Sequence, residues 1–379
     1  MKSLENKRIV LAVTGSIAAV DTVRLARELR RRGAAVIPVM SEAATGIINP
    51  EALTYACETP CITKISGMVE HVSYCGEGGK ADLLLIAPAT ANTISKIAAG
   101  IDDTPVTTFA TTAIGRPMPV VVAPAMHESM YRHPAVKKNL ETLRSWGIDI
   151  IPPKMEEERA KIADNETICL YAERALSAKP LTGKKVLISS GSCRETVDSV
   201  RILTTRSSGK MGRELALEAF RRGADVTVVS NTAAHGIVPC VKNISIETSK
   251  EMTDAVLSEA EGTDYYVSAA AISDFTPEKS NTKIPSGKPV TLHLNPAPKL
   301  ITQLTGKGIK IIGFKIGENA GAAAKELLKE EDIIAVAANA PETMGSTDGC
   351  YRIMKKDGTA VPAEGTKNTI ARKIWDAVL

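Results

Sequence analysis

The sequence predicts an α/β fold made of two Rossmann-like domains with parallel sheets. Short apolar runs end in small or hydroxylated residues and alternate with segments of helical spacing, which is typical of βαβ units. This pattern begins near residue 8 and begins again near residue 184. The length of 379 residues also exceeds what one hydrophobic core usually supports, so we expect about two domains.

Composition narrows the class of protein. Apolar residues make up 44% of the chain, yet no apolar stretch approaches the roughly 20 residues that cross a bilayer. The net charge of +4 and the aromatic content of 3% do not indicate a nucleic-acid surface. The start, Met1 to Arg8, is too polar for a secretory signal, and seven scattered cysteines do not suggest a disulfide framework. We therefore expect a cytoplasmic protein with small-molecule substrates and without nucleic-acid or membrane partners.

The chain opens with a βαβ unit. Ile9 to Val13 is an apolar strand that stops at Thr14-Gly15-Ser16, and Ile17 to Arg32 has helical spacing. Ala35 to Met40 is the next strand and ends at Ser41. Backbone N–H groups and a serine at the start of a helix favour phosphate. A dinucleotide site is disfavoured, because no G-x-G-x-x-G follows the first strand.

The unbroken apolar run Leu83 to Ala87 is the centre of the first half. It reads as a strand buried on both faces, and Pro88-Ala89-Thr90-Ala91-Asn92-Thr93 follows it. Ala123-Pro124-Ala125-Met126-His127 makes a third such corner. Because open α/β sheets bind ligands at the carboxyl ends of their strands, we expect these corners to converge on one pocket.

Single residues in these segments allow two interpretations. His71, between the second and third strands, is more often structural, although histidine is also the usual general base near neutral pH. The same two interpretations, structural and catalytic, apply to His127. Asn92 fits a cap or a turn at least as well as a ligand contact.

Taken together, the motifs resemble a known family. Gly15-Ser16-Ile17-Ala18-Ala19, His71-Val72, Pro88 to Thr93 and Ala123 to Met126 occur in the order found in flavin-dependent cysteine decarboxylases, specifically the phosphopantothenoylcysteine decarboxylases of coenzyme A biosynthesis. The resemblance implies a flavodoxin-like fold, His71 as the catalytic base, and substrate contacts from Asn92, Met126 and His127. It implies FMN held by Gly15, Ser16, Ile17, Ser41, Thr90, Ala91, Thr93 and Ala125.

Two departures from the family concern the substrate side. Asparagine usually stands where this chain has His127, and we expect His127 to take over its substrate contact. The family also has a flap whose cysteine supplies the last proton. The corresponding stretch, Pro152 to Ala163, has no cysteine, and Cys169 lies beyond it on an expected helix. The remaining candidates for the proton donor are water and a residue of the flap.

The second half repeats the opening with an insertion. Val186 to Ser189 is a strand followed by Ser190-Gly191-Ser192, and Val226 to Val229 is the next strand. Gly15 and Gly33 lie 18 positions apart, whereas Gly191 and Gly223 lie 32 apart, so the second copy carries 14 extra residues. Long loops at strand ends usually carry function. The joint between the copies falls at Ser177 to Gly183.

The inserted segment ends in hydroxyl, glycine and cationic residues at a helix start. Such a segment favours phosphate, although a solvated turn has the same composition. The motif Arg206-Ser207-Ser208-Gly209-Lys210-Met211-Gly212 and the order of later segments resemble the phosphopantothenate–cysteine ligases. That family activates a carboxylate with a nucleoside triphosphate, and cysteine then attacks the acyl-nucleotide. Thr205 stands where asparagine is usual.

The ligase resemblance implies roles for many residues. It makes Asp274 and Lys283 catalytic as well as nucleotide-binding, and it assigns substrate binding to Arg206, Ser207, Ser208, Gly209 and Lys210. The other implied nucleotide-binding residues are Gly191, Ser192, Ser268, Ala269, Ala270, Ala297, Pro298, Lys299, Leu300, Phe314, Lys325 and Lys329. The two lysines at 325 and 329 fit solvated helix charges equally well.

These resemblances predict a bifunctional enzyme, with decarboxylase residues 1–178 and ligase residues 179–379. It would ligate cysteine to 4'-phosphopantothenate and decarboxylate the product. CTP or ATP would be the cosubstrate, with Mg²⁺ on ligands that the sequence does not identify. Resemblance also suggests a homo-oligomer. The alternatives are a flavin-dependent decarboxylase of another substrate and an FMN-binding regulatory subunit, which would carry a long acidic tail where this chain ends at Leu379.

Overall fold

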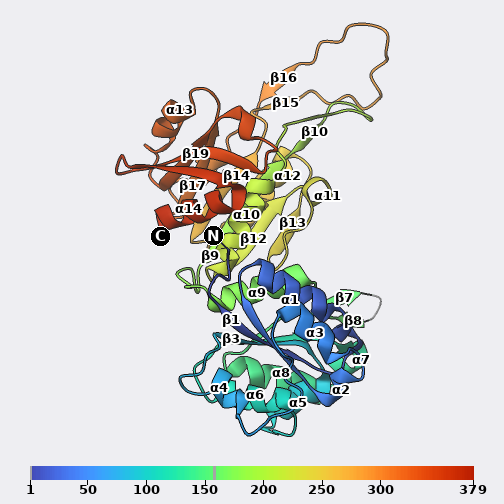
Figure 1. The fold of residues 1–379 in the computed structure, drawn as a ribbon. Helices are drawn as coiled ribbons and strands as arrows, with labels where there is room; N and C mark the ends of the chain where they lie inside the picture. Colours follow the sequence, from blue (N-terminus) through green and yellow to red (C-terminus); the bar gives the residue numbers. More distant parts are fainter. Residues whose placement is uncertain (1, 157–158) are drawn as a thin grey trace. The chain divides into compact units, whose positions relative to one another are not determined.

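The computed structural model describes residues 2–156 and 159–379. The chain divides into two compact units, Met1–Ser177 and Ala178–Leu379, which are described separately below (Figure 1). Each unit is an α/β unit built on a sheet with parallel strands, which confirms the predicted fold class. Within the described ranges, every helix is too short or too polar to cross a bilayer.

The first unit has a five-stranded parallel sheet in the flavodoxin-like order β2-β1-β3-β4-β6. Its strands are β1 (Arg8–Val13), β2 (Ala35–Met40), β3 (Leu83–Ala89), β4 (Val120–Pro124) and β6 (Asp149–Ile150). Alternate residues of β3 enter two different cores: Leu83 and Leu85 lie in one, and Leu84 and Ile86 in the other. The sheet is therefore buried on both faces.

Two helical layers cover this sheet. The core of one face includes residues of α1 (Thr22–Arg31), α3 (Pro50–Cys57) and α9 (Asn165–Leu176). The core of the other includes residues of α5 (Ala91–Ala98), α6 (Pro105–Ile114) and α8 (Pro134–Ser145). Three shorter helices, α2 (Glu42–Thr45), α4 (Glu70–Cys75) and α7 (Glu128–Tyr131), lie in the connections.

Two element boundaries differ from expectation. The first helix begins as a 3₁₀ turn, η1 (Ile17–Asp21), because the N–H and hydroxyl of Thr22 both donate to the carbonyl of Ala19 and tighten the turn. Strand β3 continues past Ala87, because the carbonyl of Pro88 still accepts from Thr14 although proline lacks an N–H.

The flap expected at Pro152 to Ala163 contains a β-hairpin. Strands β7 (Lys154–Glu156) and β8 (Arg159–Lys161) are antiparallel, and β8 pairs with β5 (Met126–His127). This pairing joins the flap to the segment that follows β4. Residues 157 and 158 of the flap lie outside the described residues.

The second unit has an eight-stranded sheet in the order β13-β12-β9-β14-β17-β18-β19-β20. Its strands are β9 (Lys185–Ser192), β12 (Asp225–Ser230), β13 (Lys242–Ser245), β14 (Tyr265–Ala271), β17 (Lys310–Ile316), β18 (Ile333–Asn339), β19 (Asp348–Lys355) and β20 (Ala360–Thr366). The expectation of a parallel sheet holds for the first six, whereas β19 and β20 are antiparallel. No crossover helix follows β18, so the chain returns beside it.

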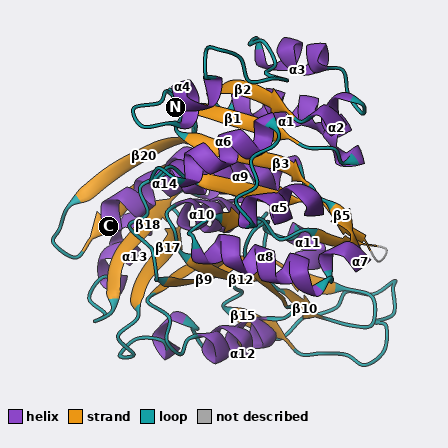
Figure 2. Ribbon diagram, turned by 90° about the horizontal axis from the view of Figure 1, so that it is seen from below, coloured by secondary structure: helices purple, strands orange, loops and turns teal. Residues whose placement is uncertain are grey.

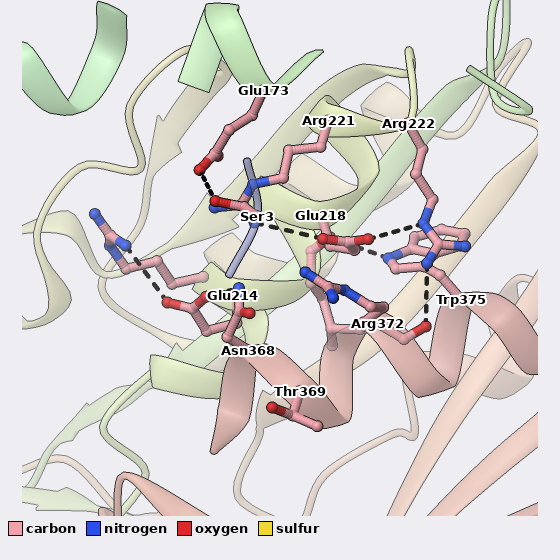
Figure 3. A network of polar contacts seen from close by, with 12 residues as sticks. Ser3, Glu173, Glu214, Glu218, Arg221, Arg222, Asn368, Thr369, Arg372 and Trp375 are labelled. Carbon is pink, nitrogen blue, oxygen red and sulfur yellow. Dashed lines mark hydrogen bonds and ion pairs between the residues drawn. The ribbon is translucent and has the colours of Figure 1, made fainter. Parts of the chain in front are cut away.

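Helices again lie on both faces of this sheet (Figure 2). The core on one face contains residues of α12 (Ser249–Glu259) and α13 (Ala320–Leu327). On the other, α10 (Lys210–Arg221) and α14 (Lys367–Val378) are joined by polar contacts (Figure 3). Trp375 Nε1 donates to the carbonyl of Leu215 at 3.1 Å, and Asn368 Nδ2 donates to Glu214 Oε2 at 3.1 Å. These contacts hold α14 beside α10 near both of its ends.

Two hairpins extend from this unit. The predicted insertion contains β10 (Arg194–Thr196) and β11 (Ile202–Thr204), and a second hairpin consists of β15 (Phe275–Pro277) and β16 (Leu294–Pro296). Figure 1 shows the loop between β15 and β16 reaching away from the sheet. We call residues 278–293 the arm loop. The N–H of Ser280 in this loop donates to the carbonyl of Val197 at 2.9 Å, which joins the two hairpins.

Candidate functional site

The first unit brings strand ends together at the carboxyl edge of its sheet. Thr14, at the end of β1, is 1% exposed; its hydroxyl donates to the carbonyl of Pro88 at 2.7 Å and accepts from the N–H of Thr90 at 3.0 Å. The N–H of Ala125 donates to the carbonyl of Ala89 at 3.0 Å. The order β2-β1-β3 places these ends at the point where strand order reverses, which is where such sheets bind ligands.

Hydroxyl groups cap the segments that begin at this edge. Ser16 caps η1, Ser41 caps α2, and Thr90 caps α5, where its hydroxyl accepts from the N–H of Thr93 at 3.2 Å. Gly15 is a necessary glycine, because a Cβ there would lie 2.5 Å from the Cβ of Ala43. The arrangement leaves small residues and helix starts at this edge, a combination that favours an anion.

The remaining residues predicted for FMN differ in exposure. Ala91 and Thr93 are buried in the first turn of α5, and Ala125 is buried after β4. Ile17 is 77% exposed, so its large apolar side chain is available to a planar ligand. Their roles in binding remain predictions.

His71 lies on α4 with one ring nitrogen buried. Nδ1 has no hydrogen-bond partner among the described residues, and the ring packs edge-on against Phe109 with 6.5 Å between ring centroids. A buried polar nitrogen without a partner is costly, and a ligand can supply the missing bond. The sheet edge therefore fits a bound flavin through a cradle that only glycine allows, and the unpartnered nitrogen of His71 fits a substrate group.

Asn92 and His127 lie on exposed surfaces of the first unit. Asn92 is in the first turn of α5. His127 Nδ1 accepts from the N–H of Ser129 at 3.3 Å and lies 2.8 Å from the Ser129 hydroxyl, so the ring caps α7. Met126, half-buried, pairs with the flap through β5. Cys169 is buried in α9, and burial raises its pKa to about 12, which makes it a poor acid.

The second unit has a cavity of about 130 Å³ at the carboxyl ends of β14, β17 and β18. The start of α10 forms one wall of this cavity. Among the residues predicted to bind substrate or nucleotide, those that line it are Ser207, Ser208, Gly209, Lys210, Ala269, Ala270 and Phe314. The structure thus brings the middle of the ligase motif and two predicted nucleotide segments together.

Several cavity residues were not predicted. Asn339, Tyr351 and Lys367 come from β18, β19 and α14. Nothing in their local sequence separates them from ordinary strand and helix residues. The positions of Tyr351 and Lys367 depend on the antiparallel return of β19 and β20, which brings the start of α14 to this edge, whereas Asn339 ends the parallel strand β18.

Other predicted residues lie outside the lining of this cavity. Lys283 is exposed in the arm loop, and Asp274 is exposed just before β15. Leu300 is only 4% exposed and packs in the core, so its side chain serves packing. The other predicted residues that do not line the cavity are Gly191, Ser192, Arg206, Ser268, Ala297, Pro298, Lys299, Lys325 and Lys329.

His235 joins the end of β9 to the ligase motif, and no pattern in the sequence indicated it. Its Nε2 accepts from the N–H of Ser192 at 2.9 Å. Gly191 has a φ of +82°, and a Cβ there would lie 2.2 Å from His235 Cδ2; a Cβ on Gly209 would also touch the ring. Burial lowers the pKa of His235, which keeps the ring neutral and able to accept that bond.

Comparison with known proteins covers both units. Residues 1–176 match the protein family described as Flavoprotein, and residues 181–379 match the DNA/pantothenate metabolism flavoprotein C-terminal domain. The Coenzyme A biosynthesis bifunctional protein CoaBC of Thermococcus kodakarensis is 44% identical, over 100% of this chain and 96% of its own length. The protein of the same name from Escherichia coli K12 is 31% identical, over 100% and 98%.

Two solved structures resemble one unit each. The C-terminal domain of a Coenzyme A biosynthesis bifunctional protein CoaBC is 28% identical with a TM-score of 0.46, covering 52% of this chain and 95% of that domain. The FMN-dependent cysteine decarboxylase SpaF is 30% identical with a TM-score of 0.41, covering 46% of this chain and 97% of that one.

Proposed function

The chain belongs to the family of coenzyme A biosynthesis bifunctional proteins CoaBC, and from that premise we propose how its two units divide the work. It is a bifunctional enzyme of coenzyme A biosynthesis that combines a flavin-dependent decarboxylase with a ligase. The second unit would join cysteine to 4'-phosphopantothenate. The first would decarboxylate the resulting 4'-phosphopantothenoylcysteine to 4'-phosphopantetheine.

In the first unit, the strand ends and caps around Gly15, Ser16, Ser41 and Thr90 would hold the phosphate side of FMN. Bound FMN supplies reversible oxidation of the thiol-bearing carbon, which gives the electrons left by CO₂ loss a place to go. His71 would take a proton from the substrate, since its buried nitrogen has no partner among the described residues. His127 is a candidate substrate contact on the segment that pairs with the flap.

In the second unit, the start of α10 would bind phosphate beside Lys210, whose ammonium lines the cavity. CTP or ATP would be the cosubstrate, with Mg²⁺ to neutralise the triphosphate. Asp274 directly precedes the hairpin of β15 and β16, and Lys283 lies in its arm loop. Both residues would reach the nucleotide from these positions.

One observation carries the decarboxylase assignment: four strand ends meet at one sheet edge, where position 15 has room only for glycine. The test is to supply the purified chain with 4'-phosphopantothenate, cysteine, Mg²⁺ and either CTP or ATP. Pyrophosphate and CO₂ are measured separately, together with flavin absorbance. A colourless chain that binds no added FMN would contradict the proposal for the first unit. Absence of pyrophosphate with either triphosphate would contradict it for the second.

We also propose a homo-oligomer in the cytoplasm. The oligomer rests on the family alone, and sedimentation of the purified chain tests it. The cysteines of the described residues form no disulfide, which suits a reducing compartment.

A further inference from the structure

Lys367 is a buried cation without a neutralising carboxylate. It is the first residue of α14 and is 6% exposed. Its ammonium donates to the Tyr351 hydroxyl at 2.6 Å and to the carbonyl of Thr343 at 3.1 Å, and it lies 4.7 Å from the centre of the Tyr351 ring. Within the described residues, no Asp or Glu oxygen lies within 4.0 Å of this ammonium.

Such a position is unfavourable unless an anion completes it. An ammonium group taken out of water requires a charge partner, and neutral acceptors with an aromatic face compensate only in part. Lys367 and both of its neutral partners, Tyr351 and Thr343, line the cavity of the second unit. The charge is therefore buried in the protein but directed at a space that a ligand can enter.

Two other sources of positive potential face the same cavity. α10 is 12 residues long, and its N-cap, Gly209, has no side-chain acceptor for the N–H groups of the first turn. Lys210 also lines the cavity and donates to the carbonyl of Gly345 at 2.8 Å. Both lysines thus contact backbone carbonyls of the short segment 343–345, bonds that an anion can replace.

We propose that Lys367 binds a phosphate group of a ligase substrate, together with the first turn of α10. The inference rests on the proposed ligase function of this unit and adds a residue to it. The cavity of about 130 Å³ is smaller than the ~300–1,000 Å³ of a pocket that encloses a whole ligand, so it suits one charged group of a larger molecule. Either the triphosphate or the phosphate of 4'-phosphopantothenate carries that group.

The test compares Lys367→Met with Lys356→Met in the full chain. Lys356 is the control, because its ammonium also donates two hydrogen bonds, to the carbonyls of Glu330 and Glu331 at 2.8 and 2.6 Å, but it lies outside the cavity lining. Calorimetry measures binding of the Mg²⁺-triphosphate and of 4'-phosphopantothenate, each alone. Loss of a charge-assisted bond should weaken one of them by about 10- to 100-fold in Lys367→Met and neither in the control.

The ligand that loses affinity identifies the phosphate that Lys367 binds. If both ligands bind Lys367→Met within twofold of the unaltered chain, the inference is wrong. CO₂ release from supplied 4'-phosphopantothenoylcysteine checks the rest of the chain, and Lys367→Arg should recover part of the lost affinity. Should Lys367→Met not fold, acetylation of Lys367 in the unaltered chain must slow when the ligand is present; an unchanged rate overturns the inference. Because binding is read without turnover, absent pyrophosphate would instead contradict the ligase function.

Discussion

His71 keeps a buried ring nitrogen without a partner within the described chain, on a short helix packed against Phe109. Leaving such a group unsatisfied costs on the order of 1–3 kcal/mol. A residue that bears this cost is more easily explained by a bound ligand or substrate than by packing. Substitution of His71 is therefore a direct test of the proposed decarboxylation.

We predict that His71→Asn lowers the rate of CO₂ release by about 10²- to 10⁴-fold, the usual contribution of a positioned general base. FMN content, measured by absorbance, should stay close to that of the unaltered chain, because His71 is not among the strand-end residues. Pyrophosphate release should also persist. A His71→Asn chain with unaltered CO₂ release would exclude the role of base.

His235 makes a prediction about pH. Burial lowers its folded pKa below the ordinary value of about 6.5, so the neutral ring favours the folded second unit. This contribution is fully present above about pH 6.5 and is lost as the pH falls through the folded pKa, when protonated Nε2 can no longer accept from Ser192. The unfolding midpoint should therefore drop between pH 8 and pH 5.5.

His235→Gln is the comparison, because its amide oxygen can accept the same bond without titrating. In a Trp146→Phe background, Trp375 is the one remaining tryptophan and reports the second unit by fluorescence. The midpoint of His235→Gln should change less with pH than that of the parent. Equal slopes in the two chains would exclude His235 as the source.

Among the elements, the arm loop is joined by hydrogen bonds to the hairpin of β10 and β11. Asp198, buried after β10, accepts from the N–H groups of Val200 at 2.8 Å and Ile284 at 3.0 Å and pairs with Arg201. The Ile284 bond, first among several, holds the pKa of Asp198 well below its usual range. Since Ile284 follows Lys283, this carboxylate fastens the loop next to the proposed catalytic lysine.

We predict that Asp198→Asn lowers pyrophosphate release by at least tenfold while CO₂ release is unaffected, because Lys283 loses its fixed position. Asp357→Asn is a matched control: Asp357 also accepts a backbone and a hydroxyl bond, both from Thr359, in a distant turn. The test measures pyrophosphate release and CO₂ release on each of the two variants. A drop of equal size in the control would assign the effect to general destabilisation.

The elements that depend on local sequence patterns could be predicted from the sequence. The βαβ openings, the strand over Leu83 to Ala87 and the insertion before α10 were predictable, because each depends on local periodicity and turn residues. The side chains of Tyr351 and Lys367 were not, because they reach the cavity only through pairing of β18 with β19 and β19 with β20. His235 was missed because its contacts are also distant in the sequence: its partner Ser192 is 43 residues away.

On the scale of the whole chain, we propose that two units of similar topology carry separate sites. Each site would lie at the carboxyl edge of its sheet, one beside small residues and helix caps and the other beside the start of α10 and the buried Lys367. We predict that Lys283→Gln impairs pyrophosphate release and leaves decarboxylation of supplied 4'-phosphopantothenoylcysteine intact. Loss of both activities in a folded chain would argue against separate sites.

The most direct test mixes the His71→Asn and Lys283→Gln chains and follows 4'-phosphopantetheine made from 4'-phosphopantothenate and cysteine. If the two sites are separate, neither chain alone makes the product, but the mixture does. The 4'-phosphopantothenoylcysteine made by the His71→Asn chain then diffuses to the Lys283→Gln chain, which decarboxylates it. A mixture that stays inactive, although each chain keeps its own half-reaction, would contradict this division of labour.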